Sequence, residues 1–401
     1  MTSKTLRFFL VIAAWAGLTG HAVTASAEPG VTDTQIVLGS VTPVSGPPSL
    51  LGKAHMAALK VWQMDVNSRG GINGRKVEIR LDDDGYVPQR AVLGVKRLNE
   101  TENIFALIGT SGSAMLQAML PYINEQKIPT VNALAVAAAH YTPPNKTVFV
   151  IGPTYCQEVS AAMTQLVKAK KLQKEKFAIV YQDDEFGTDV RCGYLKAVKD
   201  LGLNNVSEIV FKRGTKDFSA EVLALKQAGT TFLLSGGVVA EHSMLLKEAA
   251  KNQMPLTFLG VHSAHLTPVQ ALAGPAGDGY FVADYVPPLT DLSVPGMAKF
   301  MGLAQKYLST DELKSLNRYS ATAYIGALVM EDAIRRCGKD LTRACVVDKL
   351  ETMKNFGTDG LASPISFSPT VRHAPSSVLI LKSDAKASKF ERVSDPIPVV
   401  D

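Results

Sequence analysis

The stretch Val41-Thr-Pro-Val-Ser-Gly-Pro-Pro-Ser-Leu-Leu-Gly52, followed by Asn67-Ser-Arg-Gly-Gly-Ile-Asn-Gly-Arg-Lys76, decides the fold. The first segment places a turn rich in glycine and proline between an apolar strand and a long amphipathic helix. The second segment ends that helix at a Gly-Gly pair before the next strand begins. In an open parallel sheet, main-chain N–H groups and a helix N-terminus converge at such a strand-to-helix turn, and small ligands bind there.

Strand and helix patterns alternate along nearly the whole chain, which predicts an α/β fold with parallel sheets. Two such runs predict two doubly wound parallel-sheet lobes. We place lobe 1 at residues 28–150 plus 286–356 and lobe 2 at residues 151–285 plus 357–401. The chain then crosses between the lobes three times, and this predicts a three-strand hinge beside a cleft.

Residues 1–27 have the form of a secretory signal peptide. Lys4 and Arg7 precede an apolar run over residues 8–18, which is too short to span a bilayer. Ala25-Ser-Ala27 has the small-x-small form of a cleavage site, so we expect cleavage near Ala27 and export to the periplasm. The alternative is a membrane anchor.

The charge of the chain gives no sign of a nucleic-acid partner. Removing Lys4 and Arg7 with the signal peptide lowers the formal net charge by two, from +5 to +3. Basic residues are spread along the chain and form no block interleaved with aromatic residues.

The four cysteines lie at positions 156, 192, 337 and 345 and form no C-x-x-C motif. Because no histidine cluster accompanies them, we expect neither a zinc site nor a cofactor. Export favours disulfides, and the candidate pairs are Cys337 with Cys345 and Cys156 with Cys192. Buried free thiols are the alternative.

Seven segments, in order along the chain, carry a family resemblance. They are Ile36-Val-Leu-Gly39, Pro43-Val-Ser-Gly46, Gly70-Gly-Ile-Asn-Gly-Arg75, Asp82-Asp-Asp-Gly-Tyr86, Ala106-Leu-Ile-Gly-Thr110, Gln182-Asp-Asp-Glu-Phe-Gly187 and the helix over residues 319–333. With them the chain resembles the periplasmic solute-binding proteins of branched-chain amino-acid ABC transporters, the Leu/Ile/Val-binding type. The resemblance implies a type I periplasmic-binding architecture and delivery of one small solute to an inner-membrane permease. We expect the protein to be a monomer. It does not name the solute, because relatives carry amino acids, amides, urea, and aromatic or aliphatic carboxylates.

The first candidate ligand segment is Gly109-Thr-Ser-Gly-Ser113, which joins a buried strand to a helix. Ser111, Gly112 and Ser113 bring hydroxyls and free N–H groups to one spot, which suits a carboxylate. The resemblance implies that Ser113 binds the ligand carboxylate, and plain N-capping by Ser113 is the alternative. A Gly-x-Ser-x-Gly nucleophile elbow is absent, because Ser113 stands where its last glycine would be.

Further candidates come from both lobes. The loop with Ala133, Leu134 and Val136 offers carbonyl groups, and Val136 aligns with a threonine of the amino-acid binders. The remaining apolar and aromatic candidates are Leu51, Tyr155, Phe186, Val238 and Tyr319. An equally good explanation for Phe186 is a hydrophobic contact that stabilises the start of the next helix. The glycines before Val238 are also explained by a tight bend of the main chain.

His262 decides the class of ligand. It aligns with a glutamate that pairs with the ligand ammonium in the amino-acid binders. A histidine supplies no fixed negative charge, and an unpaired ammonium in a closed cleft is costly. We therefore expect a carboxylate without an amino group, aromatic or branched aliphatic. The alternative for His262 is an exposed loop position.

Three other functions remain open from the sequence. An amino acid would need another carboxylate for its ammonium, such as Asp284 or Glu158. An exported hydrolase lacks a defensible Ser/His/acid arrangement, and a sensor protein would have to dock to a membrane partner. Asp82-Asp-Asp-Gly-Tyr86 and Asp183-Asp-Glu185 are better explained as turns than as metal sites, and Tyr86 is a further candidate for the cleft.

Overall fold

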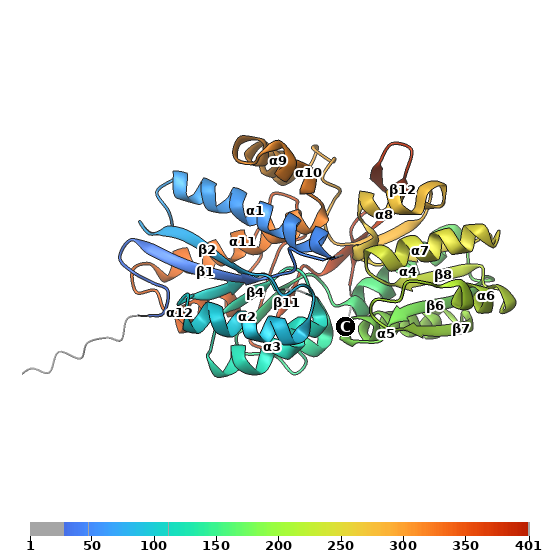
Figure 1. The fold of residues 1–401 in the computed structure, drawn as a ribbon, viewed down its shortest axis with the longest axis horizontal. Coiled ribbons are helices and arrows are strands. Elements are labelled where there is room, and N and C mark those ends of the chain that lie inside the picture. Colours follow the sequence, from blue (N-terminus) through green and yellow to red (C-terminus); the bar gives the residue numbers. More distant parts are fainter. Residues whose placement is uncertain (1–27, 47, 111, 400–401) are drawn as a thin grey trace, which may run out of the picture.

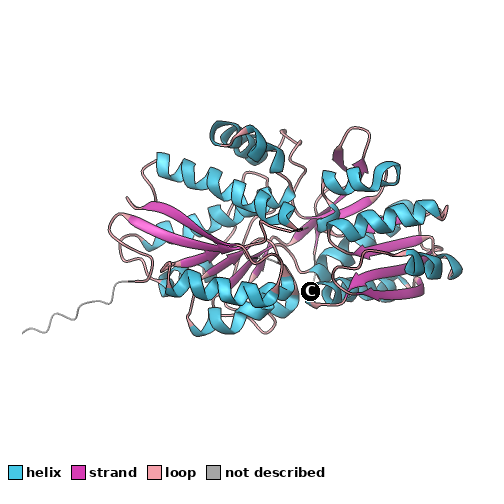
Figure 2. Ribbon diagram, viewed as in Figure 1, coloured by secondary structure: helices cyan, strands magenta, loops and turns pink. Residues whose placement is uncertain are grey.

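The computed structural model describes residues 28–46, 48–110 and 112–399. Two sheets form two lobes, one built from the blue, teal and orange parts of the chain and one from the green and yellow parts (Figure 1). Helices flank the strands of both lobes (Figure 2). No described helix combines the length and the apolar composition needed to cross a membrane.

Lobe 1 contains the first sheet. Its strands lie in the order β11 (His373–Ala374), β5 (Val148–Ile151), β4 (Thr130–Asn132), β3 (Ala106–Ile108), β1 (Gln35–Val41) and β2 (Lys76–Asp82). Its helices are α1 (Ser49–Ser68), α2 (Pro88–Glu100), α3 (Ser113–Glu125), α9 (Pro295–Tyr307), α10 (Thr310–Ser315), α11 (Arg318–Cys337) and α12 (Arg343–Glu351), with the short 3₁₀ helix η1 (Ala138–His140). α1 packs on α11 at one side of the sheet, and α2 packs on α3 at the other (Figure 1).

Lobe 2 contains the second sheet. Its strands lie in the order β13 (Lys389–Arg392), β12 (Ser377–Asp384), β10 (Phe281–Asp284), β9 (Thr257–Gly260), β8 (Phe232–Gly236), β6 (Lys176–Gln182) and β7 (Asn204–Phe211), and β14 (Ile397–Pro398) pairs with β12. Its helices are α4 (Tyr155–Lys170), α5 (Glu185–Leu201), α6 (Ser219–Gln227), α7 (Val239–Lys251) and α8 (Thr267–Ala273), with the 3₁₀ helices η2 (His262–Ala264) and η3 (Gly274–Gly277).

The two lobes repeat one strand order. The parallel strands run β2-β1-β3-β4-β5 in lobe 1 and β7-β6-β8-β9-β10 in lobe 2. Both are the doubly wound order 2-1-3-4-5, in which ligands bind beyond the carboxyl ends of the strands. Strands β3, β5 and β8 are buried along their whole length, as expected when helices cover both faces of a sheet. The doubly wound α/β fold predicted from the sequence is therefore confirmed.

The predicted three-strand hinge is present, but its third crossing lies later than we placed it. The chain passes from β5 to α4, from β10 back to α9, and finally from β11 to β12. Residues 357–374, which we assigned to lobe 2, pack on lobe 1: His373 and Ala374 pair with β5, and the ring of Phe367 lies 5.3 Å from that of Phe149. A strand of two residues leaves no periodic pattern in the sequence, so the boundary near residue 356 was wrong.

Glycines in the first turn of α1 and in the turn after that helix have clear steric roles. A Cβ atom at Gly52 would lie 2.1 Å from the carbonyl oxygen of Pro43, so only glycine lets α1 start this close to the turn. Gly71 has a φ of +82°, and a Cβ there would lie 2.0 Å from the carbonyl oxygen of Arg75. Both glycines therefore permit close approaches of main chain.

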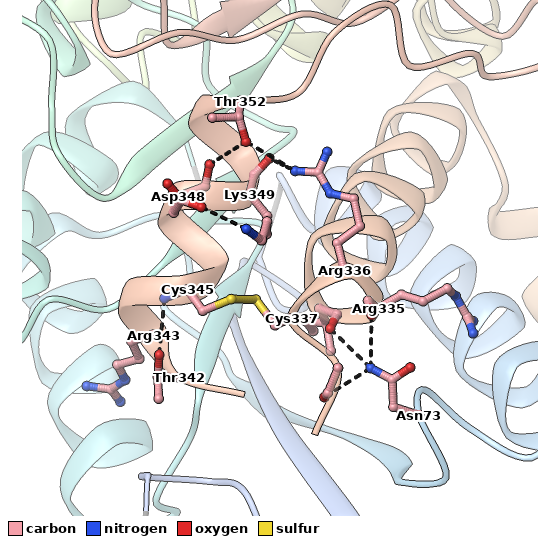
Figure 3. The surroundings of a disulfide bond; sticks show 12 residues. Asn73, Arg335, Arg336, Cys337, Thr342, Arg343, Cys345, Asp348, Lys349 and Thr352 are labelled. Carbon is pink, nitrogen blue, oxygen red and sulfur yellow. Dashed lines mark hydrogen bonds and ion pairs between the residues drawn. A yellow bond between two sulfur atoms is a disulfide. The ribbon is translucent and has the colours of Figure 1, made fainter. Parts of the chain in front are cut away.

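The turn after α1 also fastens a distant helix. The side-chain amide of Asn73 lies 3.1 Å from the carbonyl oxygens of both Arg335 and Gly338, at the C-terminal end of α11 (Figure 3). Arg75 Nη2 donates to the carbonyl oxygen of Lys339 at 3.0 Å. These donors satisfy carbonyl groups that a helix end leaves unpaired. The Gly-Gly-Ile-Asn-Gly-Arg segment therefore joins the N-terminal and C-terminal parts of lobe 1.

Both cysteine pairs considered from the sequence form disulfides. Cys337 and Cys345 join the end of α11 to α12 beside the Asn73 contacts (Figure 3). Cys156 and Cys192 join α4 to α5 in lobe 2. Each bond ties consecutive segments within one lobe, which leaves the relative motion of the lobes unrestrained by disulfides.

Candidate functional site

The N-terminus of α3 lies at the carboxyl end of β3 and carries the predicted anion-binding group. Gly112 precedes the helix in an extended conformation, and no side chain of the described residues caps the helix. Ser113 is buried, at 3% exposure, and its Oγ has no hydrogen-bond partner among the described residues. A buried hydroxyl without a partner is costly, so this group is ready to bind a ligand atom. Ser111 lies outside the described residues.

A neutral histidine donates a hydrogen bond to the first residue of α3. His140 Nε2 lies 3.0 Å from the carbonyl oxygen of Ser113, and because a carbonyl only accepts, Nε2 carries the proton. Burial lowers the pKa of His140 to about 4, so the ring stays uncharged near neutral pH. The ring therefore fixes the first turn of α3 without adding a charge.

Asn132 connects the two candidate loops of lobe 1. Its Oδ1 accepts from the hydroxyl of Thr110 at 3.0 Å and from the N–H of Leu134 at 3.1 Å, and its Nδ2 donates to the carbonyl oxygen of Ala135 at 2.5 Å. Ala133, Leu134 and Val136 are all buried. This asparagine at the end of β4 gives the loop its shape.

An aromatic cluster lies where the lobes meet, and we define it as Tyr155, Phe186, His262, Tyr285 and Tyr319. Tyr155 stacks on His262 with ring centres 5.0 Å apart, and its edge meets Phe186 at 4.7 Å. His262 meets Tyr285 at 5.3 Å and, across the hinge, Tyr319 at 6.4 Å. The structure thus brings four of the predicted residues together and adds Tyr285, which the sequence did not single out.

His262 is buried, at 1% exposure, so its alternative as an exposed loop residue is wrong. Its Nδ1 lies 2.7 Å from Glu158 Oε2, and its main-chain N–H donates to Glu158 Oε1 at 2.9 Å. Both oxygens of this buried carboxylate are therefore engaged by one residue. Glu158 comes from the first turn of α4, the helix that also supplies Tyr155.

A buried charge network forms the hinge next to the cluster. Arg318 donates from Nε and Nη2 to the two oxygens of Asp284, at 2.9 and 2.8 Å, and His265 Nδ1 lies 2.6 Å from Asp284 Oδ2. Burial alone would raise the pKa of Asp284, but Arg318 and His265 outweigh it and hold the pKa well below its usual range. Arg318 Nη1 has no hydrogen-bond partner among the described residues. Tyr285 and Tyr319 cover the guanidinium, with ring centres 4.9 and 4.8 Å from its Cζ.

The remaining candidate residues lie outside the aromatic cluster. Leu51 is buried near the start of α1, and Val238 is buried before α7, where its N–H donates to Glu241 Oε2 at 3.2 Å. Neither belongs to the aromatic cluster. Tyr86 lies over the start of α3, since a Cβ on Gly112 would be 2.5 Å from its hydroxyl oxygen.

The described members of the predicted set are all buried. A cavity of about 690 Å³ lies near the hinge, lined by residues that include Gln157, Ser363 and His373. It contains none of the predicted ligand residues.

Besides Tyr285, sequence reasoning missed His140, Glu241 and Arg318 near the site. Arg318 directly precedes Tyr319, so its place at the start of a helix was the one available signal. His140 reaches Ser113 from 27 residues away in the chain, which a single sequence does not reveal. Glu241 lies in the first turn of the helix that follows Val238, so its neighbourhood to that candidate was a local signal.

Known proteins resemble the chain over most of its length. A family model described as periplasmic binding protein matches residues 35–388. Leu/Ile/Val-binding protein homolog 7 of Brucella suis biovar 1 (strain 1330) is 27% identical over 329 residues, covering 79% of this chain and 80% of the relative.

Solved structures agree with this relationship. A fatty acid ABC transporter substrate-binding protein from Thermomonospora curvata superposes with a TM-score of 0.83 at 28% identity, covering 92% of this chain and 94% of that one. A branched chain amino acid ABC transporter protein from Thermus thermophilus with bound valine gives 0.81 at 22% identity, covering 92% and 97%. A solute binding protein of an ABC transporter from R. palustris in complex with 4-hydroxybenzoate gives 0.78 at 20% identity, covering 92% and 96%. The last two show the fold alone. With two doubly wound lobes, a three-strand hinge and a family match over most of its length, this chain belongs to the periplasmic binding protein family.

Proposed function

We propose that this protein is an extracytoplasmic solute receptor, without catalytic activity, that binds a small carboxylate lacking an amino group and delivers it to an ABC permease. Export would follow cleavage of the signal peptide near Ala27, and the receptor would act as a monomer. The solute would be an aromatic or branched aliphatic acid. Its carboxylate would bind at the N-terminus of α3, and its apolar body would lie against the aromatic cluster.

The observation that carries this proposal is the buried, unpartnered hydroxyl of Ser113 at the start of α3. The N–H groups of a first helical turn have no partner within the helix, and the helix dipole favours negative charge there. Supporting the proposal, relatives and fold neighbours include proteins described as binding fatty acids and 4-hydroxybenzoate.

The charges near the aromatic cluster support an acid without an amino group. Both oxygens of Glu158 accept from His262, and Asp284 is held by Arg318 and His265. Neither of the carboxylates considered from the sequence is thus left for a ligand ammonium. An ammonium buried without a counter-charge would be strongly unfavourable.

A second candidate, an apolar amino acid as ligand, is favoured by one observation. Glu241 is a buried carboxylate whose pKa is raised by that burial, and it makes no ion pair among the described residues. Glu241 Oε2 accepts a hydrogen bond from the N–H of Val238 at 3.2 Å. The charge of Arg213 partly offsets this rise in the pKa of Glu241, and a ligand ammonium beside Glu241 would supply a direct partner.

Thermal unfolding in the presence of matched ligands tests the proposal. We expect benzoate, 4-hydroxybenzoate, 4-methylpentanoate or 3-phenylpropanoate to raise the melting temperature, because a ligand that binds only the folded protein stabilises it. Leucine and phenylalanine are the amino-acid counterparts of the last two acids. If the amino acids stabilise the protein and the acids do not, the proposed ligand class is wrong. Loss of amino-acid binding in Glu241→Gln would then assign the ammonium to Glu241.

A further inference from the structure

Arg213 belongs to lobe 2 but touches lobe 1. It follows β7, and its Nη2 donates to Asp184 Oδ2 of the same lobe at 2.8 Å. Its Cζ lies 5.2 Å from the ring centre of Tyr86, which follows β2, and its Nη1 lies 3.8 Å from the sulfur of Met115 on α3. One guanidinium thus connects the two lobes at the edge of the candidate site.

The surroundings of Arg213 fix its position. Asp184 caps α5 by accepting from the N–H of Gly187 at 3.1 Å, and Gln182 Nε2 donates to its other oxygen at 2.5 Å. The Asp184 side chain is 9% exposed, while that of Arg213 is 32% exposed. A carboxylate held by several donors presents the guanidinium in one orientation.

Tyr86 is suited to receive this cation. Burial raises the pKa of its hydroxyl, so the ring stays neutral and keeps the electron-rich face that attracts a guanidinium. Tyr86 also lies over Gly112 and therefore covers the N-terminus of α3. Contact between Arg213 and Tyr86 consequently closes lobe 2 over the group that we assign to the solute carboxylate.

Helix α5, which Asp184 caps, makes a second contact between lobe 2 and lobe 1. Asp189 on α5 accepts from the N–H of Ala138 in lobe 1 at 3.3 Å and from the N–H of Cys156 in lobe 2 at 3.3 Å. The N-terminal half of α5, with Asp184 and Asp189, therefore lies at the edge of lobe 2 that meets lobe 1.

We propose that Arg213 is a latch residue, positioned by Asp184, that holds the lobes closed through Tyr86 and Met115 and so lengthens the lifetime of the closed state. An interaction made only in the closed state shifts the open–closed equilibrium by its own free energy. Apparent affinity scales with the fraction of molecules in the binding-competent state, so the latch strengthens binding of any solute. The proposal concerns closure and does not depend on the identity of the solute.

The test measures closure in the unliganded protein. Spin labels on Leu93→Cys and Leu223→Cys, exposed positions on α2 of lobe 1 and α6 of lobe 2, report the distance between the lobes by double electron–electron resonance. We expect a closed population in the otherwise unchanged protein. Arg213→Gln and Tyr86→Leu should each lower the closed-to-open ratio by about 3- to 10-fold, the range for a partly exposed cation–π contact. The double variant should lower it no further than one single variant does, because both remove the same contact.

Arg191→Gln is the matched control. Arg191 pairs with Glu208 at 2.6 Å and lies 6.0 Å from the ring centre of Tyr181, all within lobe 2. It has the same chemistry as Arg213 but no partner in lobe 1 among these contacts, so its replacement should leave the distance distribution unchanged. The proposal would be overturned if the unliganded protein were fully open, or if Arg213→Gln closed to the same extent as the parent. It would also be overturned if the effects of the two single variants multiplied in the double variant. Because no solute is added, these outcomes do not bear on the proposed ligand class.

Discussion

Glu158 holds His262 through both of its oxygens, one on the ring Nδ1 at 2.7 Å and one on the main-chain N–H at 2.9 Å. Both residues are buried, and Tyr155 from the same helix as Glu158 stacks on the imidazole. The imidazole is therefore fixed in orientation within the aromatic cluster, and the carboxylate serves the protein itself. This pairing is the structural reason to expect a solute without an ammonium group.

Replacing Ser113 with alanine should weaken binding of the preferred acid by about 1–3 kcal/mol, because a hydrogen bond to a charged oxygen is lost. Isothermal titration calorimetry measures the change. Ser243→Ala is the control: Ser243 is also buried and helical, but its hydroxyl donates to the carbonyl oxygen of Val239 within lobe 2. Equal affinities for Ser113→Ala and the parent protein would remove Ser113 as the carboxylate anchor.

Arg318→Met should destabilise the protein by about 3–5 kcal/mol, since it leaves Asp284 charged and buried without its partner. Denaturant unfolding followed by circular dichroism gives this value. The control Arg335→Met removes a half-exposed partner of Glu331 and should cost less than about 1 kcal/mol. Similar losses in the two variants would mean that the hinge network contributes no more than a surface ion pair.

Stability should fall as the pH is lowered from 7 to 5. Burial lowers the pKa of His55 and His140 to about 4 and that of His242 to about 3. An unfolded histidine binds its proton near pH 6.5, so in this window the unfolded state takes up more protons than the folded state and becomes favoured. Each histidine contributes on the order of 2 kcal/mol between pH 7 and 5.

The substitution His55→Gln checks this pH dependence. Glutamine keeps a donor for the carbonyl oxygen of Ile108, which His55 Nε2 contacts at 3.3 Å, but it does not titrate. Unfolding free energies measured at pH 7 and pH 5 should therefore differ less in the variant than in the parent. An identical pH dependence in both proteins would contradict the assignment.

Asn73 offers a test of the contact between the two ends of lobe 1. Asn73→Ala loses the donors to Arg335 and Gly338 and also strains a residue whose φ is +52°. Asn73→Gly loses the same donors but tolerates that φ. We expect Asn73→Ala to cost about 2 kcal/mol in unfolding free energy and Asn73→Gly about 1 kcal/mol. No loss in either variant would show that the contact does not stabilise the lobe.

Local sequence patterns predicted the elements that have local signals. The sequence patterns predict strands over residues 76–82 and 130–132 and a helix over residues 113–125, and the structure has β2, β4 and α3 at these bounds. Each has an apolar pattern bounded by turn residues, which is the information that a single sequence carries. The short elements α8, α10 and β11 lack such patterns and were missed.

The site was predictable only in part, for a similar reason. Ser113, Tyr155, Phe186, His262 and Tyr319 lie next to strand ends or helix starts, where the doubly wound fold places ligands. Arg318 reaches Asp284 across the hinge, and Arg213 reaches Tyr86 across the lobes. Such pairings depend on how the two lobes are placed against each other. The strand order is the same in both lobes, but the sequence contains no internal repeat from which this could be predicted.

The most direct test of the proposed ligand class compares 3-phenylpropanoate with phenylalanine, which differ by one amino group, in titration calorimetry on the same protein. We predict that the acid binds at least 10-fold more tightly, because the ammonium finds neither Glu158 nor Asp284 free. Tighter binding of phenylalanine, lost in Glu241→Gln, would contradict this account and assign the protein to amino-acid uptake.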